Sequence, residues 1–147
     1  MELSAAGLDL IKRSEGFRAQ VYKDVAGVPT IGYGHKLLNH QSFPDGIDEA
    51  FASEILRSDV HDAEHAVNWQ VKVPLTQGQF DALVDFVFNL GAGRLAASTL
   101  LKDLNAGRYD LAAGQLLRWD RGGGKELTAL KARRASEYEL WNSEAQA

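Results

Sequence analysis

Residues 14–35, SEGFRAQVYKDVAGVPTIGYGH, carry the most informative pattern for the fold. Within it, residues 18–22 and 28–33 are rich in β-branched and aromatic side chains, which is typical of short strands. Residues 24–27 between them read Asp-Val-Ala-Gly, and Asp and Gly favour turns. The stretch therefore predicts a small β-hairpin, with Pro29 tolerated where the second strand begins.

Alternation along the second strand predicts which of its side chains share a face. A period of two separates two sets of three residues: Thr30, Gly32 and Gly34 on one face, and Ile31, Tyr33 and His35 on the other. The first set carries almost no side-chain bulk. We therefore expect that face to leave room for a bulky ligand.

A helix is predicted before the hairpin, between Ser4 as its N-cap and Gly16 as its C-terminal stop. Leu8, Ile11 and Glu15 recur at i, i+3 and i+7 and so share one face. The carboxyl group of Glu15 should therefore point the same way as the apolar stripe, at the helix end nearest the hairpin.

The rest of the chain predicts helices. They cover residues 47–69 with Asp48 as a possible cap, 76–90 with a Thr76/Gln79 capping box, 98–105 with Ser98 as its first residue, 110–119 and 128–141. The fold class expected is α+β, mostly helical, as a two-lobed single domain over residues 1–147. Its small antiparallel β-lobe spans about 17–46, its connecting helix about 47–69, and its helical lobe about 70–147, with the first helix packed on that lobe.

The amino-acid composition excludes several classes of protein and of functional site. A chain of 147 residues with 45% hydrophobic content can bury a sizeable core as one domain. It has no cysteine, which excludes disulfides, thiolate metal sites and a cysteine nucleophile. The net charge of −4 without a strong basic patch argues against nucleic-acid binding. The N-terminus lacks a basic region and an apolar run, so we expect no signal peptide and no membrane insertion.

Glu15 and Asp24 are two carboxyl groups in unlike predicted environments. Burial disfavours the charged form and would keep Glu15 protonated, whereas Asp24, in a turn, should stay ionised. One proton donor and one group that activates water are what glycoside hydrolysis requires, and the Thr30 hydroxyl could hold that water. A helix-end glutamate and a turn aspartate are also common without catalysis, so the pattern alone leaves a structural role open.

These residues resemble the catalytic signature of phage-type lysozymes, the muramidases of glycoside hydrolase family 24. The resemblance rests on Ser14-Glu15-Gly16-Phe17, on the eight residues between Glu15 and Asp24 and the five before Thr30, and on the run 30–35. Similar segments follow in order at 75–77, 88–91, 98–101, 118–119, 123–125 and 133–134. The resemblance covers roughly residues 7–141.

The resemblance implies a lysozyme-like fold and hydrolysis of the β-1,4 bond between N-acetylmuramic acid and N-acetylglucosamine in peptidoglycan, for bacterial cell lysis. Glu15 matches the general acid, Asp24 the carboxylate that supports the attacking water, and Thr30 the residue that helps to place it. Inversion is implied, so the two carboxyl groups should be about 6.5–9.5 Å apart rather than the about 5–5.5 Å of a retaining enzyme.

Substrate contacts are expected from Gly32, Gly34 and Lys36 in the hairpin region and from Phe88 and Asn89, which match a cleft-lining segment. Core packing is an equal alternative for Phe88. Either arginine of the pair 133–134 could neighbour Glu15.

The implied enzyme needs no metal and no organic cofactor. Its partner is the glycan strand of peptidoglycan, and we expect a monomer that remains in the host cytoplasm until the membrane is permeabilised. Two other functions stay open. One is a non-catalytic peptidoglycan-binding module of the same fold. The other is a lytic transglycosylase, whose lone acid would make Asp24 and Thr30 dispensable.

Other signals favour structural roles. His35 is expected to be a structural partner, with Asp59 as one candidate mate. His61 and His65 stand at i, i+4 but lack the arrangement of a metalloprotease helix, so an exposed helix face is the favoured interpretation. The three tryptophans, Trp69, Trp119 and Trp141, are expected in helices and in the core. The glycine-rich segment 122–125 is interpreted as a connection rather than a phosphate loop.

Overall fold

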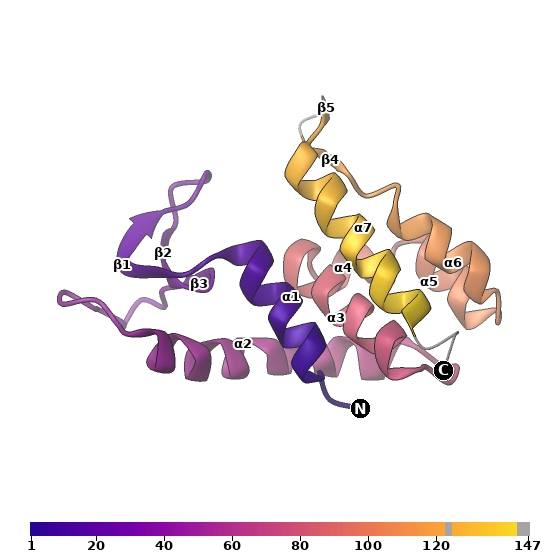
Figure 1. Cartoon of the computed structure of the whole chain (residues 1–147), viewed down its shortest axis with the longest axis horizontal. Helices are drawn as coiled ribbons and strands as arrows, with labels where there is room; N and C mark the ends of the chain where they lie inside the picture. Colours follow the sequence, from indigo (N-terminus) through magenta and orange to yellow (C-terminus); the bar gives the residue numbers. More distant parts are fainter. Residues whose placement is uncertain (123–124, 144–147) are drawn as a thin grey trace. The chain divides into compact units, whose positions relative to one another are not determined.

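The computed structural model describes residues 1–122 and 125–143 (Figure 1). Its elements in chain order are α1 (Ala5–Glu15), β1 (Arg18–Lys23), β2 (Pro29–Gly32), β3 (His35–Lys36), α2 (Glu49–Gln70), α3 (Gln77–Leu90), α4 (Ala92–Ala96), α5 (Thr99–Asn105), α6 (Tyr109–Leu116), β4 (Arg121–Gly122), β5 (Lys125–Glu126) and α7 (Thr128–Asn142). The predicted class, a mostly helical α+β fold with a small antiparallel sheet, is confirmed.

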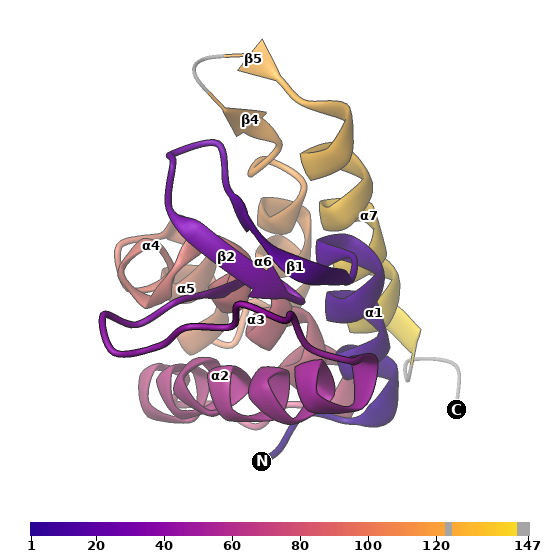
Figure 2. The same ribbon diagram turned by 90° about the vertical axis from the view of Figure 1, so that its left-hand side faces the viewer.

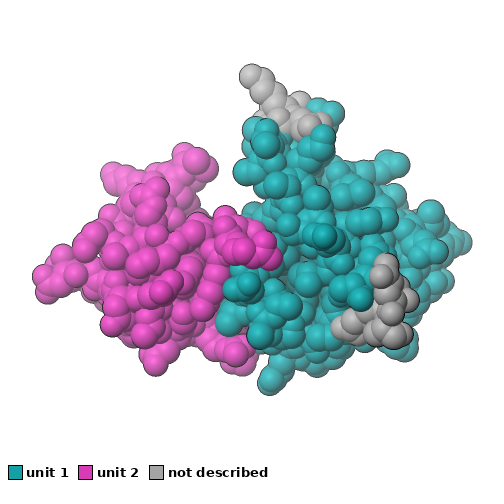
Figure 3. Space-filling view, in the orientation of Figure 1, with its two compact units in different colours: residues 1–10, 63–147 teal, residues 11–62 magenta. Residues whose placement is uncertain are grey.

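The chain forms two compact units (Figure 3). Unit 1 consists of residues 1–10 and 63–147, and unit 2 of residues 11–62. The boundaries fall inside α1 and inside α2, so each of these two helices contributes residues to both units. Unit 2 contains Glu15, Asp24 and Thr30, whereas Phe88 and Asn89 belong to unit 1.

The sheet of unit 2 is a three-stranded antiparallel meander in the order β1-β2-β3 (Figure 2). Tyr22 lies opposite Thr30, and Thr30 in turn lies opposite Lys36. Directly opposed residues of neighbouring strands share a face of the sheet. One face therefore carries an aromatic ring, a hydroxyl and an ammonium group in a row.

The predicted alternation through His35 is wrong beyond Gly32. The strand ends there, the chain turns at Tyr33 and Gly34, and β3 pairs back so that His35 lies opposite Ile31. The backbone φ of Gly32 is +66° and that of Gly34 is +77°, a conformation that glycine adopts at little cost and other residues avoid. These two glycines reverse the chain instead of continuing the strand.

The predicted helix caps are present. The Ser4 hydroxyl accepts the Gly7 amide at 3.3 Å, and Asp48 Oδ1 accepts the Phe51 amide at 2.8 Å. Thr76 and Gln79 form the reciprocal capping box of α3. Ser98, predicted as the first residue of its helix, is instead the N-cap of α5 and accepts the Leu101 amide at 3.0 Å. The five-residue helix α4 is an element that the sequence pattern does not predict.

The core of unit 1 is built around α3, which packs on α7. Phe80, Leu83 and Phe86 of α3 are fully buried. Further fully buried leucines come from α4, α5 and α6: Leu95, Leu100, Leu104 and Leu116. The connection predicted at 122–125 includes a two-stranded antiparallel pair of β4 and β5, while residues 123–124 lie outside the described residues.

The prediction for the tryptophans holds in part. Trp141 is buried, and Trp119 is half-buried and packs edge-on against Phe86 at 5.5 Å between ring centroids, although it lies beyond the end of α6. Trp69 is 70% exposed, so its predicted core position is wrong. It follows Val67, a member of the buried stripe of α2, by two positions, which places it on the opposite side of the helix.

No helix in the described part of the chain is both long and apolar enough to span a membrane.

Candidate active site

Asp24 begins the turn between β1 and β2 and is held at both carboxylate oxygens. Oδ1 accepts the backbone amides of Ala26 and Val28, each at 2.9 Å, an Asx turn that fixes the side chain against its own loop. Oδ2 contacts the ammonium group of Lys36. The Asp24 amide donates to the Val28 carbonyl at 3.0 Å, which closes the turn.

The surroundings of Asp24 favour its charged form. The hydrogen bond from Lys36, together with the Val28 amide, holds the pKa of Asp24 below its ordinary value of 3.8. The carboxylate is therefore ionised at neutral pH, as its place in a turn predicts.

Thr30 lies in β2 with only 2% of its surface exposed. Its hydroxyl donates to the Val28 carbonyl at 2.8 Å, which fixes the position of Oγ1. A hydroxyl has one proton to donate and two lone pairs that accept. Because the proton is used within the protein, Oγ1 can meet a ligand or water only as an acceptor.

Glu15 is the last residue of α1, and its half-buried carboxyl group lies against the turn that follows β2. A Cβ atom added to Gly34 would come within 2.6 Å of Glu15 Oε1 and 3.2 Å of its Cδ. Gly34 is thus required twice, by its positive φ and by this close approach. Because α1 ends at Glu15, it places the carboxyl group of this residue directly against the backbone of the turn.

The predicted open face of Thr30, Gly32 and Gly34 needs correction at its two glycines. The space beside Gly34 is taken by Glu15, and a Cβ on Gly32 would meet Ala52 at 3.2 Å and Ile47 at 3.3 Å. The missing side chains allow close packing by α1 and by the segment around the start of α2. They do not leave room for a bulky ligand at these positions.

Tyr33, between the two glycines, anchors the turn. Its ring is buried and packs on Phe17 at 5.6 Å, with the Lys12 ammonium 5.3 Å from its centroid. Its hydroxyl donates to Glu49 Oε1 at 2.7 Å. Burial, together with the Glu49 carboxylate, raises the pKa of Tyr33. The turn is therefore tied both to the end of α1 and to the start of α2.

His35 has the structural role that the sequence predicts. Its Nδ1 lies 2.7 Å from Asp59 Oδ2, and its Nε2 lies 2.8 Å from Gln41 Oε1. Because neighbouring residues of a strand face opposite ways, His35 and Lys36 lie on opposite faces of the sheet. His35 therefore binds Asp59 on one face of the sheet, and Lys36 contacts Asp24 on the other.

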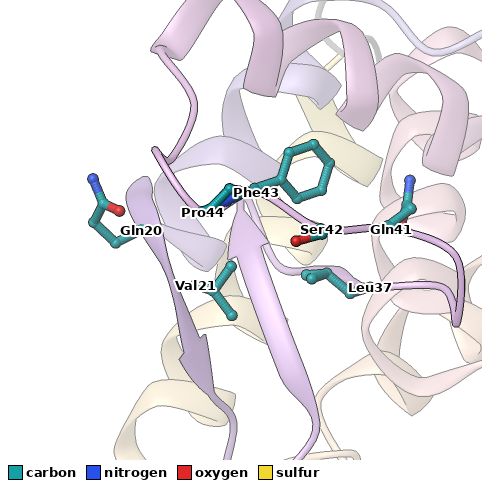
Figure 4. Close-up of a pocket in the computed structure, with 7 residues that line it drawn as sticks. All are labelled: Gln20, Val21, Leu37, Gln41, Ser42, Phe43 and Pro44. Atoms are coloured by element: carbon teal, nitrogen blue, oxygen red, sulfur yellow. The ribbon is translucent and has the colours of Figure 1, made fainter.

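A pocket of about 350 Å³ opens beside the sheet (Figure 4). Gln20 and Val21 of β1, Leu37 after β3 and the loop 41–44 line it. Glu15, Asp24 and Thr30 are not among its lining residues. The pocket is therefore separate from the carboxylates selected from the sequence.

Unit 1 holds a buried charge network that the sequence analysis did not identify. Arg133 donates to both oxygens of Asp85, at 3.0 and 2.8 Å. Arg134 donates to Glu137 Oε2 at 2.8 Å. All four side chains are at most 8% exposed. An aspartate within the apolar run of α3 was the signal that could have revealed it.

Burial and the neighbouring Asp85 carboxylate raise the pKa of Glu137 well above its ordinary value. The network also bears on two predicted substrate contacts. Arg134 donates to Asn89 Oδ1 at 2.8 Å, and the half-buried Phe88 precedes Asn89 on α3. Asn89 is thus oriented by a buried cation.

A small three-stranded sheet within a mostly helical chain is also the fold of solved structures of phage lysozymes. The family model described as phage lysozyme matches residues 12–137. The chain belongs to this family.

Relatives and solved structures agree with this assignment. The endolysin of Salmonella phage P22 is 39% identical over 146 residues, covering 97% of this chain and 99% of that protein. An endolysin structure from Escherichia coli O157:H7 phage FAHEc1 superimposes with a TM-score of 0.88 at 37% identity, covering 98% of this chain and 95% of the other.

The endolysin of Bacillus phage B103 is 44% identical over 144 residues, which make up 96% of this chain but 54% of that protein. The chain thus spans about half the length of this Bacillus phage relative.

Proposed function

We propose that the protein hydrolyses the β-1,4 bond between N-acetylmuramic acid and N-acetylglucosamine in peptidoglycan, with inversion at the anomeric carbon. Glu15 acts as the general acid, Asp24 supports the attacking water, and Thr30 helps to place that water. The observation that carries the proposal is that one compact unit holds Asp24, kept ionised on its turn by Lys36, and Glu15, whose carboxyl group lies against Gly34.

Asp24 and Thr30 are suited to orient one water molecule. Both present oxygen acceptors, since the carboxylate is ionised and the threonine proton is donated to Val28. A water that donates one proton to each oxygen would direct its lone pair away from both. As the water attacks the anomeric carbon, Asp24 takes up its proton.

Glu15 would act on the leaving group, on the other side of the glycosidic bond from the attacking water. Its proton passes to the glycosidic oxygen as the bond to the anomeric carbon breaks, so the leaving sugar departs as an alcohol. Contact with the Gly34 backbone restricts where the carboxyl group can move. Direct attack of water in this scheme predicts that the two carboxyl groups are about 6.5–9.5 Å apart.

Substrate contacts in the proposal come from Lys36 and from Phe88 and Asn89, with Gly32 and Gly34 supplying backbone. Asn89, oriented by Arg134, has an amide that can donate to a sugar N-acetyl carbonyl. The protein is proposed to act as a monomer, without metal or organic cofactor.

The test is digestion of purified peptidoglycan by the wild type and by isosteric variants. Glu15→Gln and Asp24→Asn should each lower the rate at least about 100-fold, because each removes a proton-transfer group. Glu54→Gln, at an exposed position on α2, is the matched control and should retain wild-type activity.

Analysis of the products separates the alternatives. New muramic acid reducing ends, released first as the inverted anomer in an NMR time course, support the proposal. Anhydro sugar ends would indicate a transglycosylase, and binding without release would indicate a binding module. Full activity of Glu15→Gln would refute the assignment of the acid.

The route to the wall forms a separate part of the proposal. The protein accumulates in the host cytoplasm and reaches peptidoglycan once the membrane is permeabilised. Fractionation of cells that express the full protein should recover it in the cytosol, with lysis only after a membrane-permeabilising agent is added. Lysis without such an agent would contradict this route.

A further inference from the structure

The pairing of the strands places the Lys36 ammonium group next to the Asp24 carboxylate. The chain reverses at Tyr33, and β3 pairs with β2 so that Lys36 lies opposite Thr30. From there its ammonium group contacts Asp24 Oδ2. A residue twelve positions away in the sequence is thereby made a partner of the proposed base.

The contacts of Asp24 determine which of its lone pairs can accept a hydrogen bond from a water molecule. A carboxylate offers about four acceptor positions, two on each oxygen. The amides of Ala26 and Val28 occupy those of Oδ1, and Lys36 takes one on Oδ2. The remaining position is on Oδ2, next to the ammonium group.

We propose that Lys36 is a positioning residue for the attacking water, because it holds Asp24 Oδ2 in the orientation that presents this remaining lone pair. The proposal rests on the proposed function, in which Asp24 is the base. Lys36 also favours the ionised carboxylate, so Asp24 stays competent at a lower pH than it otherwise would.

The other titratable or charged side chains of the sheet are Arg18, Tyr22 and Lys23 on β1 and His35 on β3. Arg18 stacks on the Tyr22 ring at 4.4 Å, and His35 is bound to Asp59 on the opposite face. Lys23 directly precedes Asp24 and is exposed. Within the described part of unit 2, Lys36 is the charged side chain that forms an ion pair with the Asp24 carboxylate.

The test compares Lys36→Met, which keeps the length of the side chain, with Lys36→Arg, which keeps its charge. The pH dependence of kcat/KM is measured on soluble peptidoglycan fragments, and the Asp24 carboxyl is titrated by carbon-13 NMR. In Lys36→Met both the Asp24 midpoint and the acid limb of kcat/KM should move to higher pH, since the acid limb reports the essential base. At neutral pH, kcat should fall about tenfold because Oδ2 is no longer held in place, whereas loss of the proposed substrate contact alone would raise KM and leave kcat unchanged.

Lys36→Arg should restore both midpoints toward the wild type. Lys23→Met, which removes a positive charge from the same sheet, is the matched control and should leave the acid limb in place. The pair is accessible to ions, because 61% of the Lys36 side chain and 19% of the Asp24 side chain are exposed. Added salt should therefore move the wild-type acid limb to higher pH while that of Lys36→Met stays fixed.

Suppose that the wild type cleaves peptidoglycan but that Lys36→Met leaves the titration midpoint of Asp24 or the acid limb of kcat/KM unchanged. This result would overturn the role of Lys36 and leave the proposed function in place. A wild type that releases no glycan overturns the proposed function instead. The NMR titration needs no substrate, so it still shows whether Lys36 controls the Asp24 carboxylate.

Discussion

Asp24 and Thr30 share one hydrogen-bond acceptor, the backbone carbonyl of Val28. This oxygen receives the Asp24 amide at 3.0 Å and the Thr30 hydroxyl at 2.8 Å. The amide of the same residue donates to Asp24 Oδ1 at 2.9 Å. A single residue therefore fixes the relative positions of the proposed base and the proposed water-holding group, and a shift of either is transmitted to the other.

Replacement of Thr30 tests this shared acceptor. Thr30→Val keeps the shape but removes the hydroxyl, so the free energy of unfolding should fall by about 1 kcal/mol. The rate of peptidoglycan cleavage should fall about 10- to 100-fold, as expected for loss of a water-positioning group. Thr30→Ser, which keeps the hydroxyl, should retain most of the activity. Equal activity of the valine and serine variants in a cleavage assay would contradict the role of the hydroxyl.

Gly34→Ala should disturb Glu15 directly. The new methyl group would lie 2.6 Å from Glu15 Oε1, and alanine at a φ of +77° costs about 1–2 kcal/mol. We expect both a lower free energy of unfolding and a much larger loss of cleavage activity than the stability change explains.

Gly107→Ala is the matched control, because its φ is +80° and its added methyl would meet nothing within 4 Å. It should show a similar loss of stability, measured by urea denaturation, with activity retained. Similar activities for the two alanine variants would argue against the contact between Gly34 and Glu15.

Tyr33→Phe removes the hydrogen bond that ties the turn to α2. The partly buried hydrogen bond to Glu49 at 2.7 Å should be worth about 1 kcal/mol, so the urea midpoint should fall while the slope is kept. Tyr138→Phe, at an exposed tyrosine of α7, should change the midpoint by less than half as much. The idea fails if the two variants lose the same stability.

Glu137→Gln tests the buried network of unit 1 through its pH dependence. Because the folded-state pKa of Glu137 lies above its ordinary value of 4.5, the folded protein keeps a proton that the unfolded chain releases. Wild-type stability should therefore decline as the pH rises from 4.5 toward the raised pKa.

In Glu137→Gln this decline should be smaller, because the titrating group is gone. Urea denaturation across this pH range measures it, with the exposed Glu139→Gln as control. Parallel pH profiles for wild type and Glu137→Gln would show that Glu137 does not carry the dependence.

Local structure and the identity of the proposed catalytic residues could be predicted from the amino-acid sequence. The caps at Ser4 and Thr76 and the stop at Gly16 follow from short-range hydrogen bonding and backbone preference, which act within a few residues. The first hairpin follows from turn chemistry for the same reason.

Contacts between side chains that are distant in the sequence became visible once the chain was folded. Alternation along one strand could not reveal that the chain reverses at Tyr33. This reversal places Lys36 opposite Thr30 and in contact with Asp24. Nor could alternation reveal that the space beside Gly34 is occupied by Glu15. Contacts of this kind depend on how helices and strands pack across many intervening residues, and the periodicity of one element carries no information about its neighbours.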